Sequence, residues 1–476
     1  MELERDLAAR QETRQLCRQA QEAQKLLGRM EQSQLDHICQ AVATEFAAAA
    51  SELAEMAAKE TGFGNAKDKT TKNIFASKTV WEAICEMKTV GILREDCEQK
   101  LWEIGVPMGV IAAIVPSTNP TSTICYKALI ALKSGNSIIF SPHPKALACS
   151  LKAASIVAKA AEAAGAPKGS VGCLSMGAMA GTQELMAADA VRLILATGGP
   201  AMVHAAYSSG KPAIGVGAGN GPAYIHSSAN IDYALDCILQ SKNFDYGTVC
   251  ASEQSIIVER KMEEKVKAAA QQKGFYFMST EEAGKLAKLL FRPTGALNPE
   301  IVGKSAIKLG QMAGFPLPAD TKILVAREER AGPMHPYSME KLCPVLAFYV
   351  METADAVLAK VVEVLQHEGS GHTFTMHCED QAVIRRFALE VPVSRFLVNT
   401  PAALGGIGQS TALFPALTLG CGAVGGSSSS NNISPLDLIN IRRVAWDNGI
   451  PTEKTSTDSN LVELLTAKIL ERLKIE

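Results

Sequence analysis

The pattern of apolar and polar positions changes along the chain. In the first 88 residues apolar side chains recur every three or four positions, as at Leu16, Ala20 and Ala23, which is the spacing of amphipathic helices. The stretch WEIGVPMGVIAAIVP has a strand-like pattern and predicts two strands, which can form a hairpin that turns near Pro107-Met108-Gly109. We therefore expect a helical N-terminal region followed by the start of a sheet.

Beyond this point apolar, β-branched stretches alternate with amphipathic ones. Strands are predicted over 109–116, 136–142, 170–176 and 191–197, and helices over 121–135, 145–165, 182–188 and 198–210. Such alternation is typical of a mostly parallel sheet with helices on both faces. Residues 262–425 repeat the pattern, so we expect a second α/β domain.

The C-terminal region has a different pattern. Residues 447–459 are polar and rich in turn formers, which predicts a linker. Residues 460–476 predict an amphipathic helix that starts with a capping box, Asn460 with Glu463, and carries an apolar stripe. The stripe consists of Leu461, Leu465, Ile469 and Leu473. It must be buried against this chain, against a sister subunit, or in the groove of another protein.

Composition narrows the function classes. A chain of 476 residues is too long for one compact core, so we expect two or more large domains. The net charge of −2 argues against nucleic-acid binding, which needs a basic surface. We find no signal-peptide pattern and no apolar run of the ~18 residues that a membrane span needs. These features predict a cytoplasmic enzyme without membrane or nucleic-acid partners.

The 12 cysteines are scattered, without Cys-x-x-Cys pairs. They therefore read as reduced thiols, and no cysteine or histidine cluster has the spacing of a metal site. Cys250, in FDYGTVCASEQ, comes just before a predicted strand. Taken alone, such a cysteine is most simply a small buried hydrophobe.

Two motifs follow predicted strands, where open α/β sheets bind ligands. In VPSTNPTST, the Asn119 amide can donate a hydrogen bond to an oxyanion, although Asn-Pro is also a common turn. In LATGGPAMV, Gly198 and Gly199 precede a predicted helix whose free N–H groups suit a phosphate, although a tight turn would need the same glycines.

Two further motifs have two interpretations each. Glycines alternate at Gly215, Gly217, Gly219 and Gly221, which indicates close approach either of a ligand or of a second sheet. Glu340, in EKLCPVLAFY, can hold a ribose hydroxyl, or it can be a solvated carboxylate at a strand end.

Together these motifs resemble the aldehyde dehydrogenase superfamily, and in particular its CoA-acylating branch. The resemblance covers roughly residues 10–446. It is carried by VPSTNPTST, IIFSPHPKA, LATGGPAMV, YSSGKPAIGVGAGN, FDYGTVCASEQ, EKLCPVLAFY, NTPAALGGIG and LTLGCGAVGG, in family order. It is closest to the acetaldehyde dehydrogenase half of bifunctional aldehyde–alcohol dehydrogenases and to propionaldehyde and acetaldehyde dehydrogenases of microcompartments.

The resemblance assigns roles by position. Cys250 becomes the nucleophile, and Asn119 with the backbone N–H of Cys250 becomes the oxyanion hole. The residues implied to bind the dinucleotide are Ser141, Pro142, His143, Pro144, Thr197, Gly198, Gly199, Gly217, Ala218, Gly219 and Glu340. His372, in GSGHTFTMH, matches an element of the acylating branch and is either a residue that handles the CoA thiol or a structural histidine.

One departure from the hydrolytic members indicates the reaction. They carry a glutamate that activates water, and Val216 stands at the matching place here. The resemblance therefore implies reversible oxidation of a short-chain aldehyde, acetaldehyde or propionaldehyde, with NAD and CoA to acyl-CoA. NADP in place of NAD stays open, as do sulfoacetaldehyde or succinate semialdehyde as substrate, a hydrolytic enzyme, and a non-catalytic scaffold.

The resemblance also implies an architecture. The α/β fold would have a Rossmann-type cofactor domain (1–97 and 112–225), a catalytic domain (226–425) and a small β arm (98–111 and 430–446) that joins subunits into a homodimer or a dimer of dimers. The helix of residues 460–476 resembles an encapsulation peptide, which would bind shell or cargo proteins and place the enzyme inside a bacterial microcompartment.

Overall fold

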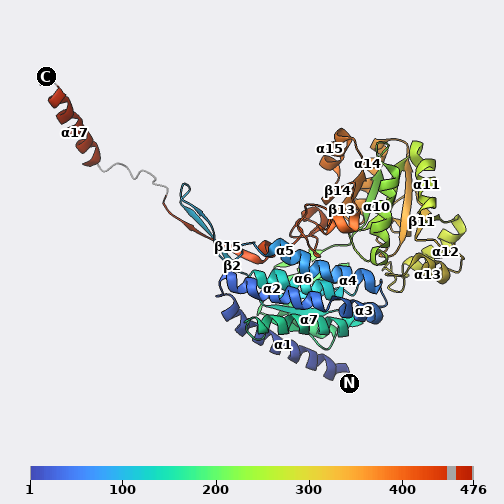
Figure 1. Ribbon diagram of the computed structural model, residues 1–476, viewed down its shortest axis with the longest axis horizontal. Helices are drawn as coiled ribbons and strands as arrows, with labels where there is room; N and C mark the ends of the chain where they lie inside the picture. Colours follow the sequence, from blue (N-terminus) through green and yellow to red (C-terminus); the bar gives the residue numbers. More distant parts are fainter. Residues whose placement is uncertain (1, 448–456, 474–476) are drawn as a thin grey trace.

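The computed structural model of the protein describes residues 2–447 and 457–473. Its strands form sheets of five, seven and three strands. In Figure 1 the N-terminal helices α2, α3, α4, α6 and α7 form one lobe, and α10 to α15 belong to a second lobe beside it. The three-stranded sheet projects from the first lobe.

The N-terminal region is helical, as predicted. Its α2 buries Leu35, Ile38 and Val42, which recur every three or four residues on one face. The Asn65 side chain accepts a hydrogen bond from the Asp68 N–H and caps α4. The helices are α1 (Glu2–Leu27), α2 (Gln32–Ala48), α3 (Ala50–Thr61), α4 (Ala66–Ile74), the π-helical turn η1 (Phe75–Thr79) and α5 (Val80–Ile84).

The first lobe contains a parallel sheet with strand order β5-β4-β3-β6-β7. The chain runs outward from β3 in both directions, so β3 and β6 flank the point where the strand order reverses. A crevice at the carboxyl ends of such strands is the usual ligand site of this fold. The strands are β3 (Val110–Val115), β4 (Ile138–Pro142), β5 (Val171–Cys173), β6 (Val191–Thr197) and β7 (Ala213–Val216). They alternate with α6 (Pro120–Lys133), η2 (Pro144–Ala146), α7 (Leu147–Ala163), α8 (Met179–Ala187) and α9 (Pro200–Tyr207), as the pattern predicted.

The second lobe is also α/β, with a parallel sheet in the order β10-β11-β12-β9-β8-β13-β14. Its strands are β8 (Gly221–Ile225), β9 (Glu253–Glu259), β10 (Phe275–Phe277), β11 (Ile323–Arg327), β12 (Val345–Met351), β13 (Gly371–His377) and β14 (Val393–Val398). The αβ repeat predicted over 262–425 is therefore present, and the sheet also takes in β8 and β9, which precede that range.

Helices and short helical turns connect these strands and follow them to the arm. They are α10 (Ile231–Asn243), η3 (Phe244–Gly247), η4 (Arg260–Met262), α11 (Glu263–Gln272), α12 (Thr280–Leu290), α13 (Ala306–Ala313), η5 (Pro336–Ser338), α14 (Ala354–His367), α15 (Gln381–Glu390), α16 (Ala402–Gly406), η6 (Ala423–Gly425) and η7 (Pro435–Leu438).

The three-stranded sheet corrects the predicted hairpin. It consists of β1 (Gly91–Asp96), β2 (Leu101–Pro107) and β15 (Ile439–Ala445), paired antiparallel in the order β1-β2-β15. The hairpin thus turns between Asp96 and Leu101 and not at Pro107-Met108-Gly109, and it spans 91–107, whereas 98–111 was predicted. The reason is burial: every residue of β3 is buried, so β3 joins the interior parallel sheet, while most of β2 is only partly buried.

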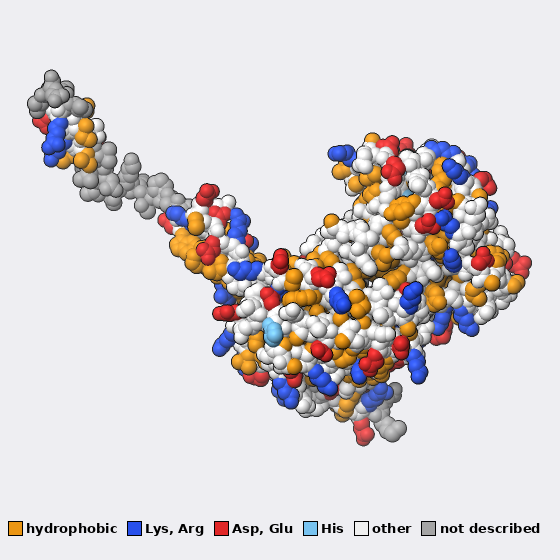
Figure 2. Space-filling view, in the orientation of Figure 1, with side chains coloured by type: hydrophobic (Ala, Val, Ile, Leu, Met, Phe, Trp, Pro, Cys, Tyr) orange, Lys and Arg blue, Asp and Glu red, His pale blue; other side chains and the backbone are white. Residues whose placement is uncertain are grey.

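Apolar side chains remain exposed on this small sheet. Trp102 and Trp446 meet edge to face, with ring centroids 4.9 Å apart. Trp446 and Ile441 stay exposed, and Figure 2 shows hydrophobic side chains gathered on the projecting sheet. An exposed apolar patch of this kind is typical of a surface that contacts another protein.

The C-terminal helix α17 (Thr457–Leu473) begins three residues before the predicted start at Asn460, so the predicted capping box does not open it. Most of the predicted linker, residues 448–456, lies outside the described residues, as do residues 474–476 of the predicted helix. Leu464, Leu465, Ile469 and Leu470 of α17 are more than half exposed. None of the described helices is long and apolar enough to cross a membrane.

Candidate active site

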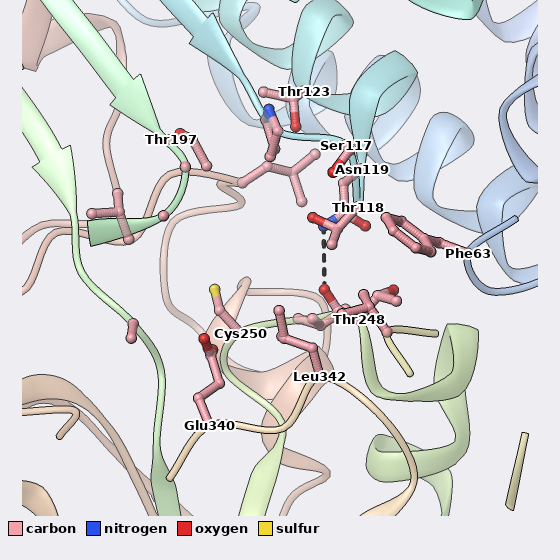
Figure 3. Close-up of a pocket in the computed structure, with 18 of the residues that line it drawn as sticks. Phe63, Ser117, Thr118, Asn119, Thr123, Thr197, Thr248, Cys250, Glu340 and Leu342 are labelled. Carbon is pink, nitrogen blue, oxygen red and sulfur yellow. Dashed lines mark hydrogen bonds between the residues drawn. The ribbon is translucent and has the colours of Figure 1, made fainter. Parts of the chain in front are cut away.

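A cavity of about 310 Å³ lies at the carboxyl end of β3 and β6 and contains Cys250, Asn119 and Glu340 in its wall. Asn119 is the N-cap of α6, just after β3, whereas Cys250 lies in the turn before β9 and Glu340 in the loop before β12. Figure 3 shows Asn119 and Thr197 on one side of a common space and Cys250 and Glu340 on the other. The cavity therefore brings residues of both lobes together.

Cys250 is partly exposed and carries a free thiol. Burial, and to a smaller extent the nearby Glu340 carboxyl, raise the pKa of the Cys250 thiol to about 12. Within residues 2–447 and 457–473, the Cys250 N–H donates to no backbone carbonyl of the loops. It is therefore available to a ligand. The site thus offers a sulfur nucleophile with a backbone donor beside it.

Asn119 presents its amide N–H group towards the Cys250 segment. Its Oδ1 accepts a hydrogen bond of 2.6 Å from Lys72 Nζ. Its Nδ2 donates to Thr118 Oγ1 at 3.2 Å and to the Thr248 carbonyl at 3.4 Å. The second bond is long (dashed in Figure 3), so this N–H can turn to an oxygen bound at Cys250.

Three charged residues behind Asn119 were not identified from the sequence. Lys69 and Lys72 of α4 donate to Asp245 Oδ2 at 2.9 Å and 2.6 Å, and all three side chains are buried. Asp245 and the next residue, Tyr246, adopt left-handed backbone conformations with φ of 47° and 52°. Asp245 stands in the quoted Cys250 motif, but nothing local in the sequence shows that it pairs with a helix more than 170 positions earlier.

The residues predicted to bind the dinucleotide line two adjoining cavities. Thr197, Gly198 and Gly199 line both the Cys250 cavity and a second one of about 430 Å³. The predicted Ser141, Pro142, His143 and Pro144 line the second cavity, and His143 also borders the first. Thr197 Oγ1 is buried without a hydrogen-bond partner, which a ligand in the cleft would supply. An elongated cleft with such an unpaired hydroxyl fits a dinucleotide.

The glycine-rich segment after β7 passes directly beside Cys250. Gly217 and Ala218 line the first cavity, as does Val216. Gly219 donates its N–H to Glu340 Oε1 at 2.9 Å. A Cβ on Gly219 would lie 1.9 Å from the Cys250 carbonyl oxygen, so only glycine fits there. Among the alternating glycines, close approach of backbone therefore accounts for Gly219.

Glu340 is not a solvated carboxylate at a strand end. It lines the cavity, and burial, with the neighbouring Glu368 carboxylate, raises the pKa of Glu340 to about 8. The Glu340 carboxyl is therefore mostly protonated at neutral pH. A protonated carboxyl can donate a hydrogen bond but does not activate water.

His372 lies apart from the cavity wall. It is fully buried in β13, with Nδ1 hydrogen-bonded to Thr373 Oγ1 at 2.9 Å and Nε2 without a partner. Burial, together with the Arg395 guanidinium, holds the pKa of His372 well below its usual range, so the ring is neutral. The structure thus groups the other predicted site residues around two cavities and leaves His372 behind them.

Known proteins are similar in sequence to most of this chain. Bifunctional aldehyde-alcohol dehydrogenase AdhE of Escherichia coli (strain K12) is 42% identical over 435 residues, which cover 90% of this chain and 49% of that protein. The chain thus spans about half the length of this relative. Succinate-semialdehyde dehydrogenase (acetylating) of Clostridium kluyveri is 34% identical over 436 residues, 91% of this chain and 96% of that protein.

Several solved structures are also similar to this chain in sequence and fold. An acetylating aldehyde dehydrogenase from Geobacillus thermoglucosidasius has 48% identity and a TM-score of 0.91, covering 93% of this chain and 98% of that one. A propionaldehyde dehydrogenase from the Clostridium phytofermentans fucose utilisation bacterial microcompartment has 27% identity and a TM-score of 0.83, covering 93% and 99%. The propionaldehyde dehydrogenase of Rhodopseudomonas palustris, solved with bound CoA and an acylated cysteine, has 28% identity and a TM-score of 0.83, covering 91% and 97%.

The aldehyde dehydrogenase family profile matches residues 4–274, more than half of the chain and a range that includes Asn119, Thr197 and Cys250. This match agrees with the two α/β lobes and with the cysteine between them. The chain therefore belongs to the aldehyde dehydrogenase family.

Proposed function

We propose that the protein is a CoA-acylating aldehyde dehydrogenase, which oxidises a short-chain aldehyde with NAD and CoA to an acyl-CoA. The observation that carries the proposal is the composition of the Cys250 cavity. A cysteine and an amide donor face one space there, while Val216 stands where hydrolytic members place their catalytic glutamate. Glu340 is the one carboxylate among the described lining residues, and its raised pKa makes it a poor base at neutral pH.

The first step is addition of the Cys250 thiolate to the aldehyde carbonyl. The carbonyl oxygen then becomes an oxyanion, which Asn119 Nδ2 and the Cys250 N–H stabilise by hydrogen bonds. A tetrahedral thiohemiacetal on Cys250 results. Both donors lie beside Cys250 before the substrate arrives, so only a small turn of the Asn119 amide away from the Thr248 carbonyl is needed as the charge develops.

The nicotinamide cofactor would lie in the cleft formed by the two cavities. Thr197, Gly198, Gly199, Gly217, Ala218 and Glu340 would hold its nicotinamide half, and the segment from Ser141 to Pro144 would hold its adenosine half. When bound there, the cofactor would supply the hydride acceptor for the oxidation. The protein's part is to hold that carbon on Cys250 beside the cleft.

Loss of the hydride leaves a thioester on Cys250, and its fate depends on the surrounding side chains. Without an ionised carboxylate to activate water, the thioester persists until the thiol of CoA attacks it. We propose that His372, whose Nε2 has no partner, accepts a hydrogen bond from the CoA thiol once CoA binding opens a path to it. The lowered pKa of His372 makes it a weak base.

The cavity favours a small apolar aldehyde. Phe63, Val249, Leu342, Ile407, Leu417 and Leu419 are apolar lining residues. The basic side chains among the described lining residues are His143, on the cofactor side, and Lys72, which is paired with Asp245. Sulfoacetaldehyde or succinate semialdehyde would need an unpaired cation for its anionic end. Acetaldehyde or propionaldehyde therefore fits better.

Two exposed apolar surfaces support a proposal for assembly and location. The three-stranded sheet would join subunits into a homodimer or a dimer of dimers. The exposed apolar residues of α17 would bind a shell or cargo protein and place the enzyme inside a bacterial microcompartment. Confinement of this kind would retain a volatile aldehyde.

The test is NADH formation from acetaldehyde and NAD, with and without CoA, with the product identified by mass spectrometry. We expect turnover that requires CoA and yields acetyl-CoA, and no turnover in Cys250→Ser. Steady formation of free acetate without CoA would instead identify a hydrolytic enzyme. A Cys250→Ser variant that keeps its cellular role would favour a non-catalytic scaffold.

A further inference from the structure

The network behind Asn119 joins the two lobes through buried charges. Asp245 Oδ2 accepts hydrogen bonds from Lys69 and Lys72 of α4, and its Oδ1 accepts one of 2.8 Å from the Asn65 N–H. Lys69 Nζ also donates to the Thr118 carbonyl at 2.9 Å. These bonds anchor the left-handed turn at Asp245 to the N-terminal helix α4. The same turn leads on to Cys250.

Lys72 has no free donor in this arrangement. Its Nζ donates to Asp245 Oδ2 at 2.6 Å, to Thr248 Oγ1 at 2.9 Å and to Asn119 Oδ1 at 2.6 Å. The side chain is 3% exposed, and lysines are so deeply buried almost only when their charge is paired. The ammonium group is thus held at one place, in contact with the amide oxygen of Asn119.

This contact fixes which end of the Asn119 amide faces the cavity. In the orientation given, Oδ1 meets the ammonium while Nδ2 meets Thr118 Oγ1 and the Thr248 carbonyl. A half-turn of the amide would set its N–H groups against the ammonium and its oxygen against the Thr248 carbonyl. Both contacts would be repulsive, so Nδ2 is kept on the side of Cys250.

The charges also act on the strength of the donor. Lys69 and Lys72 share one oxygen of the Asp245 carboxylate, and the Lys72 ammonium group lies in direct contact with Asn119 Oδ1. A cation at an amide oxygen draws electron density from the nitrogen, which makes its N–H groups stronger donors. The effect is large in a buried site, where solvent does not screen it.

We propose that Lys72 is a positioning residue for the oxyanion hole: it holds the Asn119 amide with Nδ2 towards Cys250 and strengthens that donor. The inference deepens the proposed function, on which it rests. Lys72 acts through Asn119 and makes no contact with the reacting carbon. Its contribution should therefore disappear when the Asn119 amide is absent.

A double-mutant cycle tests this dependence. The rate measured is NADH formation from acetaldehyde at saturating NAD and CoA, expressed as kcat/KM for Lys72→Met, Asn119→Ala and the double variant. We expect Asn119→Ala to lower kcat/KM by about 10²- to 10³-fold, because removal of one oxyanion donor costs that order. Lys72→Met should lower kcat/KM at least about tenfold, because it weakens the same donor. The double variant should be no slower than Asn119→Ala.

Other results would overturn the proposal. Two losses that multiply in the double variant, or a Lys72→Met enzyme within about threefold of the wild type, would show that Lys72 does not act through Asn119. Lys67→Met is the matched control, because it removes an exposed lysine of the same helix and should leave kcat/KM unchanged.

Folding and reaction type are separated in the same experiment. Thermal melting and the rate of Cys250 alkylation report the fold, and if Lys72→Met fails to fold, the cycle is repeated with Lys72→Gln, which keeps a polar side chain but removes the charge. NADH formation reports aldehyde oxidation whether the acyl group goes to CoA or to water, so failure of the acylating function is seen separately, in the product. A wild-type protein that forms no NADH from any short-chain aldehyde would overturn both proposals.

Discussion

At the scale of single residues, the site holds Cys250 in its less reactive form. Burial, together with Glu340 when it carries a charge, raises the pKa of the Cys250 thiol to about 12. Since the pKa of Glu340 is about 8, its carboxyl is mostly protonated below that pH and mostly ionised above it. Below that pH Glu340 is neutral and disfavours the thiolate little, whereas above it the carboxylate opposes thiolate formation.

Glu340→Gln should therefore raise the reactivity of Cys250 at alkaline pH only. We expect alkylation by iodoacetamide to be about threefold faster than in the wild type above pH 8, equivalent to about half a pKa unit, and equal near pH 6. Mass spectrometry of the Cys250 peptide gives the rate without interference from the other cysteines. A difference that is constant across pH would contradict the charge effect.

Val216→Glu should redirect the thioester to water. A carboxylate at the place of the hydrolytic glutamate would activate water in the Cys250 cavity, so free acetate should appear in the absence of CoA. Because Val216 is 5% exposed, burial will raise the pKa of the new carboxyl, and hydrolysis should increase with pH. Product analysis between pH 6 and pH 9 checks both statements. Val216→Gln, with similar size and no base, should give no acetate.

At the scale of elements, the segment between β7 and β8 sets the position of the Cys250 turn. Gly219 contacts the Cys250 backbone on one side and binds Glu340 through its N–H on the other. The segment thus separates the Cys250 turn from Glu340. The space between them admits only a residue without a side chain.

Gly219→Ala should displace the Cys250 turn. Its Cβ would lie 1.9 Å from the Cys250 carbonyl oxygen, so backbone has to move, and we expect kcat to fall at least about tenfold with a lower melting temperature. Gly284→Ala is the matched control. That glycine lies inside α12 with no atom within 4 Å of the added Cβ, and the change should leave kcat unaltered and raise the free energy of unfolding by about 0.5–1 kcal/mol.

At the scale of the whole molecule, the site exists only where the two lobes meet. The first lobe supplies Asn119 and Lys72, and the second supplies Cys250 and Glu340. Lys72 and Asp245 are 173 positions apart in the chain yet share a hydrogen bond. In contrast, α17 lies at the far end of the chain, and its described side chains are exposed.

Removal of residues 448–476 should therefore leave catalysis intact and abolish recruitment. We expect kcat and KM for acetaldehyde within about twofold of the full chain, because no described residue of α17 lines either cavity. Co-purification with microcompartment shells should be lost. Replacing Leu465 and Ile469 by glutamate in the full chain should have the same effect. Retained co-purification would show that the helix does not recruit the enzyme to the shell.

The sequence by itself determined the alternation of strands and helices, because the periods of apolar residues are local. Short motifs around Cys250 and Asn119 also led to the prediction that these residues are the nucleophile and its amide donor, and both line one cavity. The hairpin was misplaced, since the local pattern of 98–111 does not tell which of two sheets a strand enters.

Only the tertiary structure decided what surrounds those motifs. The pairing of α4 with the Asp245 turn, the raised pKa of Glu340 and the distance of His372 from the cavity wall depend on residues far apart in the chain. Burial and charge pairing arise where the lobes come together. The sequence shows which ionisable side chains are present. Packing decides which of them are buried and which partners they contact.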